Sequence, residues 1–120
     1  MKYLLTTLVA FALSTSAFAQ EIAGKYDLEG ANPGGTGRYV GDVTVAATGD
    51  TYQVLWQIGN QKQEGTGILI GNTFAVSYRQ GNAAGIAVFE RGTDGTLTGA
   101  WAPIGSSAMG IEIWKPDAGM

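Results

Sequence analysis

The sequence predicts an all-β protein made of about eight short antiparallel strands. Apolar and polar residues alternate with a period of two along most of the chain, which is the pattern of a strand with one buried face. Glycine stands beside asparagine, aspartate or proline at regular intervals between these stretches, as expected of tight hairpin turns. The 120 residues include 19 glycines and only 3 prolines. These observations together favour an up-and-down meander.

Turn signals divide the chain into its predicted strands. In chain order they are Asn32-Pro33-Gly34-Gly35, Thr48-Gly49-Asp50, Gly59-Asn60, Gly71-Asn72, Gly81-Asn82 and Thr93-Asp94-Gly95. The strands are expected at residues 22–30, 37–47, 51–58, 62–70, 73–80, 84–91, 95–102 and 107–115. Because every connection is short, neighbours in sequence should pair as antiparallel neighbours in space.

The first three strands show the alternation most clearly. In the first strand Tyr26 and Leu28 alternate with Asp27 and Glu29, and we expect these two carboxylates to form a solvated outer face. The second strand alternates in the same way from residue 39 to residue 45. The third, over residues 52–58, places a tyrosine, a valine, a tryptophan and an isoleucine on one face.

The later strands combine alternation with internal glycines. Gly65 and Gly67 in the fourth strand and Gly99 in the seventh permit the strong coiling that a small barrel needs. In the last strand two isoleucines flank Glu112. If the isoleucines point inward, this carboxylate faces solvent, unless the strand is bulged.

Closure of the meander into a barrel would remove its two unpaired edges, and eight is a common number of strands for closure. A partly open barrel or a small sandwich is the alternative. The expected inward face consists of Tyr26, Leu28, Val43, Val45, Tyr52, Val54, Trp56, Ile58, Ile68, Ile70, Phe74, Val76, Tyr78, Ile86, Val88, Leu97, Trp101, Ile111 and Ile113. Eight-stranded interiors are either just filled or hold one small ligand, and with so many bulky residues we expect this one to be mostly filled.

Residues 1–19 have the features of a secretory signal peptide. Lys2 is followed by an apolar run to Leu13, and Ala17-Phe18-Ala19 provides small residues for cleavage before Gln20. We therefore expect a single barrel domain over residues 20–120, located in the periplasm or secreted. Short strands with charged outward positions disfavour a transmembrane barrel, so no membrane span is expected in the mature protein.

Composition excludes several kinds of chemistry. The chain has no histidine and no cysteine, so the usual zinc sites and the Ser-His and Cys-His nucleophile pairs are absent. A net charge of −3 without a basic stripe makes nucleic acid a poor partner. We expect no catalytic residues, no metal ligands and no cofactor. An enzyme using Asp or Glu alone, as some glycosidases do, would need a facing carboxylate pair that the sequence does not clearly supply.

Aromatic residues provide the candidate binding sites. Trp56, Tyr78 and Trp101 come from three strands of the expected inward face, and they could stack on a small apolar or planar ligand in the barrel mouth with Arg79 near the rim. The competing interpretation is that these rings form the core.

Two further aromatic residues, Phe89 and Trp114, are expected to point outward. On the surface they could form a protein-binding patch. They could equally be covered by the N-terminal segment or by a dimer partner.

Several segments also follow one another in a familiar order. They are residues 30–35 (GANPGG), 39–43 (YVGDV), 48–56 (TGDTYQVLW), 65–68 (GTGI), 75–78 (AVSY), 94–101 (DGTLTGAW) and 110–114 (GIEIW). This arrangement is similar to a family of small exported proteins of alphaproteobacteria, some of which are labelled "fibronectin-binding protein". The general shape is similar to calycin barrels such as lipocalins and avidins, although Gly24-Lys25-Tyr26 replaces the Gly-x-Trp opening of lipocalins and the polar set of a biotin pocket is missing.

Two binding functions remain open from the sequence. The first is a non-catalytic module of the cell envelope that recognises a protein or matrix partner through loops and outward aromatic residues. The alternative is a calycin-like carrier of one small apolar ligand in the barrel mouth. The oligomeric state does not follow from the residues.

Overall fold

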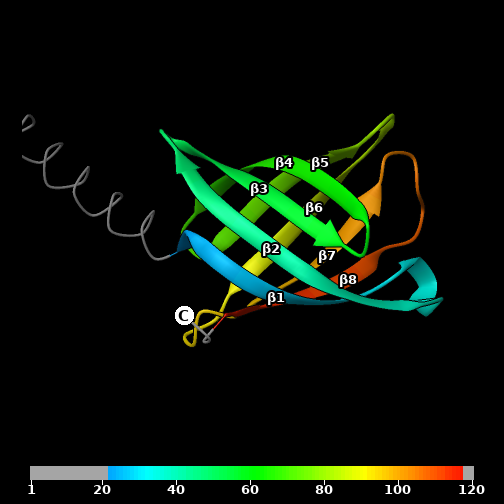
Figure 1. Cartoon of the computed structure of the whole chain (residues 1–120), viewed down its shortest axis with the longest axis horizontal. Coiled ribbons are helices and arrows are strands. Elements are labelled where there is room, and N and C mark those ends of the chain that lie inside the picture. Colours follow the sequence, from blue (N-terminus) through cyan, green and yellow to red (C-terminus); the bar gives the residue numbers. More distant parts are fainter. Residues whose placement is uncertain (1–21, 118–120) are drawn as a thin grey trace, which may run out of the picture.

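The computed structural model describes residues 22–117, and these residues form one closed antiparallel barrel (Figure 1). Eight strands follow one another around the barrel in chain order: β1 (Gly24–Ala31), β2 (Arg38–Thr48), β3 (Thr51–Ile58), β4 (Gln61–Ile70), β5 (Thr73–Gln80), β6 (Ala83–Arg91), β7 (Leu97–Pro103) and β8 (Gly110–Pro116). A short 3-10 turn, η1 (Pro33–Gly35), lies between β1 and β2. The predicted signal peptide lies outside the described residues.

Pairing of the first strand with the last closes the barrel. β1 pairs with β2 on one side and with β8 on the other, where Leu28 is opposite Trp114. The all-β, up-and-down fold predicted from the sequence is therefore confirmed, and closure removes the edges that an open sheet would expose. Within residues 22–117 no helix has the length and the apolar character needed to cross a membrane.

Glycines form the tight hairpins at the predicted positions. Gly59, Gly71 and Gly81 have φ values of 60°, 62° and 58°, in the left-handed region that L side chains rarely adopt. The Gly-Asn signals in the sequence thus correspond to the β3–β4, β4–β5 and β5–β6 turns.

The expected inward face is wrong in β4, β6 and β8. Its members in these strands lie on the outer wall instead: Ile68, Ile70, Ile86, Val88, Ile111 and Ile113. Ile70 is 75% exposed and Ile86 is 60% exposed. In each of these strands both faces carry apolar residues, so alternation alone does not fix which face points inward.

Steric fit decides the orientation of these strands. The inward positions of β6 and β8 each run from a glycine at one end to a large ring at the other, as in Gly85-x-Ala87-x-Phe89. Phe89 lies opposite Gly99 of β7, and a Cβ on that glycine would overlap the phenyl ring. Glycines on neighbouring strands make room for several of the large rings in this narrow barrel, where rows of β-branched side chains from both β6 and β8 would crowd the interior.

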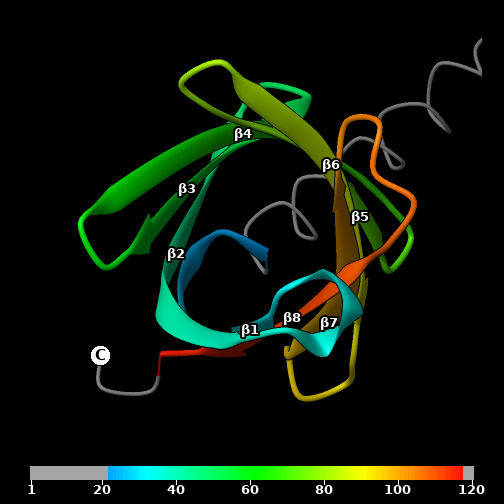
Figure 2. The same cartoon turned by 90° about the vertical axis from the view of Figure 1, so that its right-hand side faces the viewer.

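The two ends of the barrel differ in packing. At one end Ile22, Phe74, Phe89 and Trp114 are at most 1% exposed, and the Tyr26 hydroxyl donates to the Ile22 carbonyl oxygen at 2.6 Å. This closed end is filled, as expected for the whole interior. The other end, which carries η1 and the β7–β8 connection, faces the viewer in Figure 2 and holds a cavity.

Candidate functional site

The cavity at the open end has a volume of about 250 Å³. Its walls come from strands all around the barrel and from the β1–β2 connection: Asn32, Tyr39, Trp56, Ile58, Gln61, Gln63, Tyr78, Ala87, Trp101 and Glu112. Ligand sites for drug-sized molecules usually have volumes of roughly 300–1,000 Å³, so this cavity is suited to a small molecule.

Glu112 is the buried charged residue of the cavity wall. Its side chain is 6% exposed. The indole nitrogens of Trp56 and Trp114 both donate to Oε1, at 3.2 and 2.9 Å, and the Tyr39 hydroxyl donates to Oε2 at 2.7 Å. Three donors thus hold the carboxylate rigidly, because hydrogen bonds to a charged acceptor are stronger than those between neutral groups.

Four aromatic rings continue from this carboxylate around the cavity. The centroids of Tyr39 and Trp101 are 6.4 Å apart, those of Trp101 and Tyr78 6.2 Å, and those of Tyr78 and Trp56 6.1 Å. The angles between successive ring planes are 71°, 77° and 67°. Since Glu112 bonds to both Tyr39 and Trp56, the five side chains form a closed ring, which we call the aromatic–carboxylate ring.

Inward glycines on neighbouring strands make this ring possible. Tyr39 lies opposite Gly30, and Tyr78 opposite Gly85. A Cβ on either glycine would overlap the facing ring. The same relationship joins Trp101 to Gly110. Each ring therefore lies across a bare stretch of the adjacent strand, in an arrangement known to stabilise glycines in sheets.

Burial and the nearby carboxylate keep the two tyrosines protonated. Burial raises the pKa of the Tyr39 hydroxyl strongly, and the hydrogen bond to Glu112 and the charge of Glu112 raise it further. The pKa of Tyr78 is also raised, by burial and then by the charge of Glu112. Both hydroxyl groups therefore stay neutral at ordinary pH.

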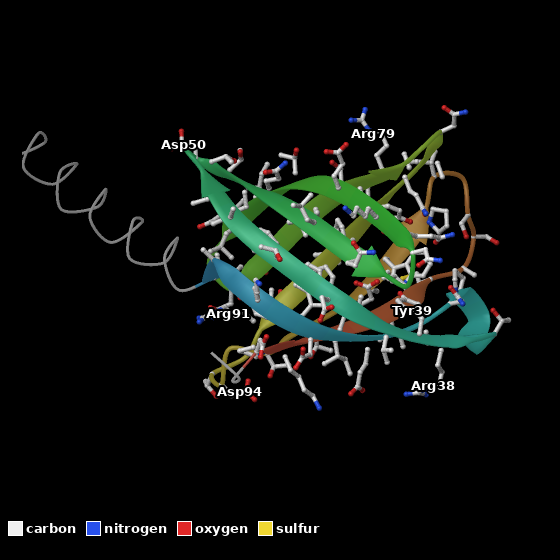
Figure 3. All side chains as sticks on the ribbon, in the orientation of Figure 1. Arg38, Tyr39, Asp50, Arg79, Arg91 and Asp94 are labelled. Atoms are coloured by element: carbon white, nitrogen blue, oxygen red, sulfur yellow. The ribbon has the colours of Figure 1, made fainter. Side chains whose placement is uncertain are left out.

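The structure brings together three of the four predicted ligand-binding residues. Trp56, Tyr78 and Trp101 all line the cavity. Arg79 does not, because it points away from the barrel (Figure 3) and forms an exposed ion pair with Glu64 at 3.5 Å. As the next residue after Tyr78 along β5, it must face the opposite side of the sheet.

The outward orientation expected for Phe89 and Trp114 is wrong. Both rings lie inside the barrel, at 1% and 0% exposure, with centroids 4.2 Å apart. Trp114 also contacts the rings of Tyr26, Trp56 and Phe74. The proposed surface patch therefore does not exist, and these residues are the centre of the closed-end core.

Glu112 and Tyr39 were missed as site residues. Glu112 was expected in solvent, yet it is buried without a bulge, because β8 keeps continuous pairing with β7. A signal was present in the sequence, because Gly110, Glu112 and Trp114 share one strand face. In this barrel the strand face that carries both a glycine and a large aromatic ring points inward in β6 and in β8. Tyr39 carried no signal beyond sharing one strand face with Gly41 and Val43.

Comparison with known proteins assigns neither a family nor a function to this chain. The chain matches none of the protein-family models searched and shows no significant similarity to a curated protein. The aromatic–carboxylate ring and the cavity it encloses are therefore the features of this chain that point to a function.

Proposed function

We propose that this protein is a non-catalytic, exported binding protein that holds one small ligand in the open end of its barrel. The observation that carries the proposal is the aromatic–carboxylate ring around a cavity of about 250 Å³. Apolar walls with a few well-placed polar groups are the usual composition of small-molecule sites. The mouths of β-barrels are among the common places for them.

The fixed positions of the side chains at the base and wall of the cavity support the same proposal. The filled closed end fixes Trp114, and Trp114 in turn holds Glu112 by the 2.9 Å hydrogen bond. A binding group held by a packed core loses little conformational entropy when the ligand arrives. Gln63 is fixed in a similar way at the wall, since its amide donates to Gln80 at 3.1 Å.

Native mass spectrometry of the protein purified from its own host is the first test. We expect a mass excess that disappears on denaturation, together with a change in tryptophan fluorescence when the ligand is added back, because Trp56 and Trp101 line the cavity. Trp101→Ala should abolish binding, and Arg79→Ala, which alters only the outer face, should not. A protein that carries no small molecule and responds to no compound of a chemically diverse library would contradict the proposal.

Recognition of a protein partner is the second candidate. The observation that favours it is a row of apolar residues paired across the outer wall of β4 to β8: Ile68, Ala75, Val88, Ala100 and Ile111. Exposed apolar patches commonly mark interaction sites. Binding to immobilised fibronectin, the partner implied by the family resemblance, should then be weakened by Val88→Glu and unaffected by Trp101→Ala. The opposite pattern would contradict this second candidate.

A further inference from the structure

The charge at the base of the cavity has no counter-charge in its walls. Glu112 is accompanied by three neutral donors, and among the described residues no lysine or arginine lines the cavity. Neutral donors satisfy the carboxylate's hydrogen bonds but do not cancel its charge. Buried charges in proteins are normally paired, so this cavity favours a positively charged occupant and repels an anion.

The remaining walls are suited to the same occupant. Tyr39, Trp101, Tyr78 and Trp56 stand at steep angles to one another, as the walls of a box do. Aromatic faces attract cations through the negative potential above the ring, with tryptophan the strongest and tyrosine next. Boxes of several such rings are the usual receptors for quaternary ammonium groups.

The number of free hydrogen-bond acceptors distinguishes among cations. A carboxylate offers about four lone-pair sites, and three donors already occupy Glu112. About one site is left, and Ile58 and Ala87 add apolar groups to the cavity wall. A primary ammonium brings three N–H donors and a guanidinium brings five, which is more than the remaining acceptor site of Glu112 can satisfy. A methylated ammonium needs few or none.

From this combination we infer that the ligand is a small organic cation with a methylated ammonium group, held by the four rings and balanced by Glu112. This inference rests on the proposed function and specifies the class of its ligand. The methylated head lies among the rings, and any polar remainder of the ligand extends toward the amides of Asn32, Gln61 and Gln63, which also line the cavity.

A pair of probes that differ only in charge tests the inference directly. Choline and 3,3-dimethyl-1-butanol have nearly the same shape, but the second carries carbon in place of nitrogen and is neutral. In calorimetric titrations of the wild-type protein at low ionic strength, choline should bind at least about tenfold more tightly than its neutral isostere, since a desolvated cation–π contact and a buried carboxylate both favour the charge. Equal affinities, or a preference for the isostere, would overturn the inference.

Variants assign the preference to the named residues. Glu112→Gln keeps an acceptor for the two indoles and removes the charge, so choline binding should weaken by at least about tenfold while binding of the isostere stays the same. Tyr78→Leu keeps an apolar wall but removes the π face, so it should weaken the binding of choline and leave the binding of the neutral isostere unchanged. Arg79→Ala, the adjacent outward residue, is the matched control. If Glu112→Gln fails to fold, the Tyr78→Leu comparison and the wild-type preference still decide the question.

The two proposals fail in different ways. If a library scan by tryptophan fluorescence finds neutral or anionic ligands for the cavity and choline does not bind, the cation inference is wrong and the small-ligand function stands. If no compound of any charge binds in the cavity, both are wrong. Choline binding that is lost in Tyr78→Leu and kept in Arg79→Ala supports both.

Discussion

Trp114 and Glu112 are two residues apart on β8, and both point into the barrel, where Trp114 Nε1 donates to Glu112 Oε1 at 2.9 Å. Trp114 belongs to the filled closed end, since it is fully buried and contacts four other rings. Glu112 belongs to the cavity at the open end. This one hydrogen bond therefore joins the part of the barrel that supplies stability to the part that is proposed to bind a ligand.

Replacing Trp114 by alanine should destabilise the protein severely. The indole is fully buried at the centre of the core, and Trp→Ala changes in cores cost about 3–5 kcal/mol. The free energy of unfolding from urea denaturation measures the loss. Leu55→Ala, at a 46% exposed outward position, is the control and should cost far less. A small loss for Trp114→Ala would contradict its place in the core.

The two simplest substitutions of Glu112 should differ in their effect on stability. Glu112→Ala leaves the buried indole nitrogens of Trp56 and Trp114 without an acceptor, at about 1–3 kcal/mol for each unsatisfied group. Glu112→Gln retains an amide oxygen for them and should cost about 1 kcal/mol or less. Denaturant unfolding of both variants checks this order. Equal losses would mean that the three hydrogen bonds contribute little.

Adding a methyl group at Gly110 should disturb the cavity wall. The new Cβ would overlap the Trp101 indole and lie 2.6 Å from the Ala31 carbonyl oxygen. Overpacking of this kind costs about 1–3 kcal/mol, and the displaced indole should shift the tryptophan emission. Ala84→Ser on the exposed outer face of β6 is the control. If Gly110→Ala left both the tryptophan emission and the stability unchanged, the close approach of the Trp101 indole to Gly110 would not be needed for the position of the indole.

Stability should fall at alkaline pH. The pKa values of Tyr39 and Tyr78 are raised in the folded protein above the ordinary value of 10.0, so above about pH 10 the unfolded chain loses protons that the folded one retains. The stabilisation is complete below that pH and is lost as the pH rises. Urea unfolding at increasing pH should show the decline, and Tyr39→Phe should make it shallower. A flat profile would contradict the burial of these hydroxyl groups.

The exposed ion pair between Arg79 and Glu64 should matter little. Both side chains are more than half exposed, and exposed pairs contribute about 0–1 kcal/mol. Arg79→Ala should therefore leave the melting temperature nearly unchanged at physiological salt. A loss of ligand binding in this variant would return Arg79 to the site.

The alternating pattern was enough to predict the fold. Strand positions and hairpin turns follow from local features, such as the Gly-Asn pairs at residues 59, 71 and 81 and the short connections that favour antiparallel neighbours. Closure stayed open against a partly open barrel or a small sandwich, because it depends on the pairing of β1 with β8, which are far apart in sequence. Trp56, Tyr78 and Trp101 could be assigned to the interior because the residues on the opposite face of each strand are polar or small, apart from Leu55.

Only the closed barrel decided which face of β4, β6 and β8 points inward. Ile86 and Phe89 belong to opposite apolar faces of one strand, and nothing local ranks them. Which face points inward depends on the residues of the neighbouring strands. Gly99 on β7 leaves room for Phe89. Glu112 can be buried because Tyr39 on β2, Trp56 on β3 and Trp114 on β8 donate hydrogen bonds to it. Periodicity is a property of one strand, whereas steric fit and hydrogen-bond satisfaction are properties of all eight together.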